Sequence, residues 1–245
     1  MGNIILTIRS LLAFVLPPLA GVLILLLFLP FGRQRAVNLA IPVITRLGLG
    51  LSGMRIQVNG DRALLHRRPA IYVVNHQSST DPIIIASLLR HDVCGVARSE
   101  LRHHPLLGPL LMLAGTVFVA RNEDDGSRKL ATALDALAED RAVIINIESQ
   151  RSDNGKLLPF RPAALWLAHT ARVPLIPLVL HNSHEVLPPG ARLIRPGTVK
   201  VSVLPALNAK KLTLGQLEQH FHETLKPASD HPDAEKHRPA GRGQL

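Results

Sequence analysis

A long uncharged apolar run near the N-terminus is the feature that most constrains how this chain can fold. No charged residue lies between Arg9 and Arg33, and residues 11–31 read LLAFVLPPLAGVLILLLFLPF. As one continuous helix this run would be about 31 Å long, which is enough to cross the hydrocarbon core of a bilayer. The run therefore predicts a helical segment that attaches the chain to a membrane.

Two adjacent prolines leave the form of that attachment open. Pro17 and Pro18 lack backbone donors and disfavour helix at the residue before each of them. The segment is predicted either to span the bilayer or to form two short helices, residues 4–16 and 19–29, as a hairpin sunk into one leaflet.

A cleaved signal peptide and a buried core helix are the two alternatives to a membrane segment. A signal peptide fits the basic start and the apolar middle, but no small-residue cleavage site follows before Arg33 and Arg35. Core helices are rarely apolar on every side. We therefore favour a membrane-associated helical segment over residues 1–54, in which residues 34–54 form a helix kinked at Pro42. The flanking arginines predict the inner (cytoplasmic) membrane, with the rest of the chain on its cytoplasmic side.

The charge balance indicates an anionic partner. The chain has 28 Lys and Arg against 18 Asp and Glu, a net charge of +10. Nucleic acid, a membrane surface and a phosphorylated substrate are the three candidates. Only 3% of the residues are aromatic, which offers few platforms for base stacking and disfavours nucleic acid. The single cysteine, Cys94, excludes a disulfide scaffold.

From Arg55 onward, short β-branched runs alternate with helical segments, a pattern typical of an α/β domain. We predict a single domain over residues 55–226, with a central mostly parallel or mixed sheet flanked by helices. Residues 227–245 mix Pro, Gly, His and both charge signs, and are predicted to be disordered. The predicted strands are residues 56–58, 71–74, 93–96, 117–120, 143–147, 175–180 and 199–203, and the predicted helices are 82–90, 106–114, 127–140, 163–171 and 214–225.

The stretch IYVVNHQSSTDP, residues 71–82, is the strongest candidate for a site. A buried strand ends there in Asn75-His76, and Asp81 follows at the start of the next helix, where Asp81 or Thr80 is expected to act as the cap. A carboxylate five residues after a histidine can accept the Nδ1 proton and leave Nε2 free to take a proton from a hydroxyl. By itself this spacing is weak evidence, because a polar turn with His76 capping a helix would look the same.

The N-H-x4-D string is followed by G-T-V-F-V-A-R at residues 115–121, and together the two blocks resemble the glycerolipid acyltransferase family over roughly residues 55–207. The resemblance implies that His76 and Asp81 are the catalytic pair. It implies that Arg98 and Arg121 meet the substrate phosphate, with Asn75 in a supporting role. The remaining matches to the family blocks, also expected to support the site, are Gly115, Phe118 and Pro177, the last in the strand block V-P-L-I-P.

A third block departs from the family pattern F-P-E-G-T-R-S and reads N-I-E-S-Q-R-S over residues 146–152. Arg151 is expected to bind the phosphate, and Glu148 to position the arginines. Ser149 replaces a glycine, and its Cβ restricts positive φ and close backbone approach to a phosphate. This departure leaves the identity of the acceptor open.

The resemblance implies transfer of a fatty acyl group from acyl-CoA or an acyl carrier protein to a lysophospholipid hydroxyl. The expected acceptor is 1-acylglycerol-3-phosphate, which would give phosphatidic acid. Backbone amides after His76 are expected to stabilise the oxyanion.

No bound cofactor and no metal are expected, because the 12 histidines are scattered. The expected partners are membrane lipids and an acyl carrier protein, not nucleic acid, and no oligomeric state is predicted. Another lyso-lipid acceptor, such as a lyso-aminolipid, and a catalytically weakened lipid-binding protein are the alternatives.

Overall fold

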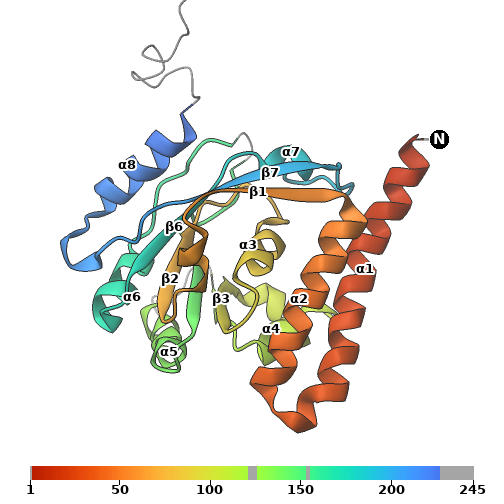
Figure 1. Ribbon diagram of the computed structural model, residues 1–245, viewed down its shortest axis with the longest axis horizontal. Helices are drawn as coiled ribbons and strands as arrows, with labels where there is room; N and C mark the ends of the chain where they lie inside the picture. Colours follow the sequence, from red (N-terminus) through yellow and green to blue (C-terminus); the bar gives the residue numbers. More distant parts are fainter. Residues whose placement is uncertain (1, 121–125, 153–154, 227–245) are drawn as a thin grey trace, which may run out of the picture.

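One mixed sheet of seven strands lies at the centre of the described molecule (Figure 1). The computed structural model describes residues 2–120, 126–152 and 155–226. The strand order is β1-β7-β6-β2-β5-β3-β4. All neighbouring strands run parallel except β6 and β7, which pair antiparallel. The bounds are β1 Met54–Gly60, β2 Ala70–Val74, β3 Val93–Arg98, β4 Val117–Val119, β5 Ala142–Asn146, β6 Leu175–Leu180 and β7 Gly197–Val203.

The central strand β2 is buried on both faces, as a continuous apolar run predicts for a strand of a parallel sheet. Tyr72 and Val74 contribute to one core cluster with α3, whereas Ile71 and Val73 contribute to a second cluster with α5, α6 and α8. The helix bounds are α1 Gly2–Phe28, α2 Arg33–Ser52, α3 Asp81–Leu89, α4 Leu107–Leu113, α5 Gly126–Ala138, α6 Ala163–Ala171, α7 Ser183–Val186 and α8 Leu214–Leu225, and the short 3-10 helices are η1 Leu29–Phe31, η2 Arg62–His66, η3 Ser99–His103 and η4 Ala209–Lys211.

The predicted α/β class is confirmed, and all seven predicted strands and five predicted domain helices are present within a few residues. The short helix α7 was not predicted. The tail over residues 227–245 lies outside the described residues.

The N-terminal apolar segment is one continuous helix, α1, so of the two predicted forms the pair of short helices broken at Pro17 and Pro18 is wrong. Both prolines lie on the buried face of α1, which also carries Ala13, Gly21 and Leu25 at four-residue spacing around Pro17. The packing of this face against α2 and the domain therefore outweighs the cost of the two helix hydrogen bonds that the prolines cannot donate.

A helical hairpin forms instead from α1 and α2. The chain reverses direction between them at Gly32, where φ is +112°. The two helices lie side by side along one flank of the molecule (Figure 1). By length and composition, the segment over residues 4–31 could cross a membrane. Only 28% of its most apolar 18-residue stretch is buried. The outward face is strongly apolar, with exposed Ile4, Ile5, Ile8, Leu11, Phe14, Leu19, Leu23, Leu26, Leu27 and Phe31.

Glycine lets α2 approach α3 closely. A Cβ atom placed on Gly48 of α2 would lie 2.4 Å from Ile83 Cδ1 of α3 and 3.8 Å from Pro17 Cγ of α1. The three helices therefore interlock at this point. Because α3 begins at Asp81, the hairpin packs directly against the helix that carries the predicted carboxylate.

Candidate active site

The site forms where β2 ends and the chain turns toward α3. Asn75 is fully buried, and its side chain is paired with the backbone of Leu180 at the end of β6. Its Nδ2 donates to Leu180 O (2.9 Å), and its Oδ1 accepts from Leu180 N (2.8 Å). Asn75 thus fastens the carboxyl ends of two neighbouring strands together, which fixes the start of the turn that follows.

His76 and Asp81 form the predicted pair. His76 Nδ1 lies 2.8 Å from Asp81 Oδ2, and the side chains are 18% and 1% exposed. The same Oδ2 accepts the backbone amides of Gln77 (2.7 Å) and Ser78 (2.8 Å). Three donors hold the carboxylate, so Nδ1 carries the proton and Nε2 is the ring nitrogen left to accept one.

Two local expectations about this turn are met only in part. Asp81 does not cap α3 from outside; it is the first helical residue, and Thr80 at the cap position makes no side-chain capping bond. The amides of Gln77 and Ser78 are occupied by Asp81, so these two cannot stabilise an oxyanion. The physical reason is common to both corrections: the carboxylate turns back to organise the loop around the histidine.

Glu148 holds the backbone of the turn, in place of its predicted role of positioning the arginines. The residue is 4% exposed and follows β5. Its Oε2 accepts His76 N (2.5 Å), and its Oε1 accepts Leu158 N (2.6 Å). Both carboxylate oxygens thus serve backbone amides, and burial raises the pKa of Glu148 above its usual 4.5.

The structure brings one of the predicted phosphate-binding arginines to this turn and a second to the loop after β5. The Arg151 guanidinium donates to Ser79 Oγ, and Ser79 is an exposed residue in an otherwise largely buried turn. Arg98, at the end of β3, donates from Nη2 to Ser149 O (3.2 Å). Arg121 lies outside the described residues.

The altered third block fits its loop without backbone strain. Ser149 is not among the residues with positive φ, so the loop does not require glycine at that position. Ser152 N donates to His76 O (2.8 Å), which adds a further tie between this loop and the turn that follows β2.

Of three predicted supporting residues, two lie in the sheet and the third lies in the turn just before β4. Pro177 in β6 pairs in register with Val73 of β2. Phe118 in β4 pairs with Ala97 of β3, one residue before Arg98. Gly115 adopts a φ of +71° and accepts a hydrogen bond from Cys94 Sγ (3.0 Å), so it shapes the entry into β4.

Sequence reasoning assigned no role in the site to Ser78 and Ser79, which lie between the two motif residues. Ser78 Oγ donates to Leu187 O (2.8 Å), just after α7. Their place inside the H-x4-D turn was a signal that could have marked them as neighbours of the site. The contact with Leu187 could not be read from the sequence, because the two residues are 109 positions apart.

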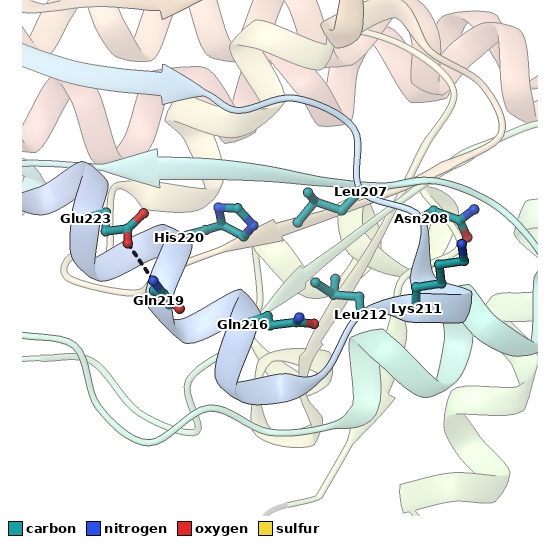
Figure 2. A pocket seen from close by; sticks show the side chains of 8 residues that line it. All are labelled: Leu207, Asn208, Lys211, Leu212, Gln216, Gln219, His220 and Glu223. Carbon is teal, nitrogen blue, oxygen red and sulfur yellow. Dashed lines mark hydrogen bonds between the residues drawn. The ribbon is translucent and has the colours of Figure 1, made fainter.

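The hollow shown in Figure 2 does not belong to this site. It measures about 440 Å³ and lies between α8 and the segment that follows β7. Within the described parts of the chain, no group of three or more His, Cys, Asp or Glu side chains is arranged to hold a metal ion. The lining residues of the hollow are Leu207, Asn208, Lys211, Leu212, Gln216, Gln219, His220 and Glu223.

The α/β fold and the histidine–carboxylate pair at the end of the central strand define the type of site. Comparison with known proteins identifies the family. Residues 55–181, just over half of the chain, match the family model described as Acyltransferase. The chain belongs to the acyltransferase family and is an enzyme of that class.

Curated relatives narrow the class. The chain is 30% identical over 201 residues to the 1-acyl-sn-glycerol-3-phosphate acyltransferase of Limnanthes alba, covering 81% of this chain and 71% of the relative. It is 32% identical over 163 residues to human 1-acyl-sn-glycerol-3-phosphate acyltransferase beta, covering 66% of this chain and 59% of that protein. The fold matches the crystal structure of the 1-acyl-sn-glycerophosphate acyltransferase of Thermotoga maritima with a TM-score of 0.76, at 23% identity and 98% coverage of both chains.

Proposed function

We propose that this enzyme transfers a fatty acyl group from an acyl thioester to the free hydroxyl of 1-acylglycerol-3-phosphate, giving phosphatidic acid. The observation that carries the proposal is the His76–Asp81 pair, whose Nε2 has no hydrogen-bond partner among the described residues, with Arg151 bound to the same turn through Ser79. The curated relatives carry the name of this activity, which supports the choice of acceptor.

The geometry supports a direct transfer. Asp81 holds the proton on Nδ1 of His76. His76 Nε2 takes the proton of the acceptor hydroxyl while the hydroxyl oxygen attacks the thioester carbonyl. The carbon–sulfur bond then breaks, and the leaving thiolate takes the proton from His76. Arg151 and Arg98 would hold the acceptor's phosphate through charge-assisted hydrogen bonds. The step needs no covalent enzyme intermediate.

The donor, the partners and the location are part of the same proposal. Acyl-CoA and acyl carrier protein are both acidic thioester donors, and they suit a chain with a net charge of +10. The exposed apolar face of α1 would place the enzyme on membrane lipids, where the acceptor resides. The proposed location is the cytoplasmic side of the inner membrane.

The first test is acylation of a panel of lyso-lipids by the purified protein and its His76→Ala variant. We expect lysophosphatidate to be the preferred acceptor. His76→Ala should lower kcat by about 10²–10⁴-fold, since general-base catalysis contributes that much. Thermal unfolding, measured in the same detergent, should be unchanged. A variant that retained the wild-type rate would rule out the mechanism.

The acceptor phosphate is tested by Arg151→Ala. A lost charge-assisted hydrogen bond should raise KM about 10- to 100-fold for lysophosphatidate but not for an uncharged lyso-lipid. Arg55→Ala is the matched control, because Arg55 is exposed on the edge strand β1. Preference for a lyso-aminolipid in the panel, with no effect of Arg151→Ala, would favour that acceptor instead.

A further inference from the structure

A buried glutamine inside the catalytic turn binds two other segments of the chain. Gln77 is 1% exposed. Its Nε2 donates to Gly155 O (3.3 Å), and its Oε1 lies 3.1 Å from His184 Nδ1. Because Oε1 can only accept, His184 Nδ1 must carry a proton and donate it. One amide therefore connects the turn, the loop after β5 and the helix α7.

The imidazole of His184 also lies directly against Gly155. A Cβ atom placed on Gly155 would lie 2.7 Å from His184 Cε1 and 3.1 Å from Nδ1. Gly155 has a φ of +74°, which side chains disfavour, so the position suits glycine on both grounds. The ring and the loop are thus in close contact, in addition to the hydrogen bonds through Gln77.

This contact holds the loop that carries the phosphate-binding candidates. The loop begins at Glu148, which accepts His76 N, and includes Arg151, which donates to Ser79. The Gly155 contact fastens the far side of the same loop. It adds to the ties that residues 148–152 make to the turn and to the Glu148–Leu158 bond within the loop.

We infer that His184 is a positioning residue for acceptor binding. Through Gln77 and Gly155 it holds the loop so that Arg151 stays over the catalytic turn, at the place where the acceptor's phosphate would bind. The part of this inference that concerns phosphate rests on the proposed function.

Two substitutions separate the hydrogen bond from the bulk of the side chain. His184→Leu replaces the imidazole with an apolar side chain of similar size and leaves the buried Gln77 oxygen without its donor. His184→Asn places an amide N–H near the position of Nδ1 and restores that donor. We expect His184→Leu to raise KM for lysophosphatidate about three- to tenfold, the range of one lost hydrogen bond. We expect kcat and KM for the acyl donor to stay within about twofold, and His184→Asn to return KM to within about twofold of wild type.

The matched control is His181→Leu. His181 lies three residues earlier, but its Nε2 lies 2.8 Å from Ser202 Oγ of β7, away from the loop. This variant should leave KM for the acceptor unchanged. Equal effects of His184→Leu on both substrates and on kcat, or no rescue by asparagine, would overturn the inference, because either result indicates a general structural role.

Hydrogen exchange tests the same contact without any substrate. Peptides that cover residues 148–158 should exchange about three- to tenfold faster in His184→Leu than in wild type, and not in His181→Leu. Unchanged exchange in His184→Leu would disprove the contact. If wild-type enzyme fails to acylate lysophosphatidate, the proposed function is wrong, and the exchange measurement still decides whether His184 holds the loop.

Discussion

Asp81 and Glu148 are two buried carboxylates that organise the backbone around His76. Asp81 accepts two amides and the imidazole with one oxygen, whereas Glu148 accepts one amide with each oxygen. A carboxylate is the only side chain that can accept on both oxygens without offering a donor. Glu148 therefore matters to the position of His76 even though it does not touch the ring.

Replacing Glu148 with glutamine should destabilise the fold. A glutamine can accept one of the two amides, but its NH₂ group would face the other amide donor. We expect the free energy of unfolding at pH 7.5 to fall by about 1–3 kcal/mol, with a lower kcat. Denaturant titration and turnover measure these effects. Glu218→Gln is the control, because Glu218 accepts Phe160 N with Oε1 and a glutamine oxygen can take that place.

The pH dependence of the same variant follows from the raised pKa of Glu148. Since burial raises the pKa above 4.5, the folded state binds the proton more tightly than the unfolded state. The resulting stabilisation is fully present below pH 4.5 and is lost as the pH rises through the folded-state pKa. The difference in unfolding free energy between wild type and Glu148→Gln should therefore be larger at pH 4.5 than at pH 7.5. A difference that grows with pH would contradict this assignment.

At the residue scale, the spacing together with the family resemblance predicted the His76–Asp81 pair and little beyond it. A histidine and an aspartate five residues apart can meet only across one tight turn, so their contact was readable. The direction of the Glu148 carboxylate was not, because a sequence does not show which donors lie around a buried group. His184 is 107 residues from Gln77, and no local signal connects them.

At the scale of elements, the contact of α2 with α3 through Gly48 gives the next prediction. Gly48→Val would drive a side chain into Ile83 and displace the helix that begins at Asp81. We expect a loss of about 1–3 kcal/mol in unfolding free energy, typical of overpacking, and a lower kcat. Gly50→Val is the control on the same helix, since nothing lies within 4 Å of a Cβ there. Equal effects of the two variants would show that helix propensity, not the Ile83 contact, is responsible.

The strands were predictable because a parallel sheet buries both faces, and their sequences therefore read as short apolar β-branched runs. The continuity of α1 was not predictable. The two prolines favour a break locally, whereas the packing that overrides them comes from a separate helix, α2, which begins 15 residues after Pro18. The antiparallel direction of β7 likewise depends on how the chain returns after α7.

At the scale of the whole molecule, the exposed face of α1 predicts membrane binding. Leu23, Leu26 and Leu27 are 57%, 70% and 59% exposed. Replacing all three with glutamine should lower partition into phosphatidylcholine–phosphatidylglycerol vesicles by about tenfold or more per leucine, the cost of exposing a side chain that lipid would bury. Vesicle sedimentation measures this. Trp166→Gln, which removes another exposed apolar side chain from α6 on the far side of the sheet, should leave the partition unchanged.

The pairing of β1 with β7 has a consequence for how the protein is made. β1 follows the α1–α2 hairpin directly, yet its neighbour in the sheet is β7, Gly197–Val203. At about 5–20 residues per second, a ribosome needs on the order of ten seconds or more to reach that partner after completing β1. During that interval the hairpin can already lie in the lipid while the first strand still lacks its hydrogen bonds. A nascent chain whose hairpin has bound lipid would be held at the bilayer before the rest of its domain can fold, and the sheet closes only when nearly all of the domain has emerged.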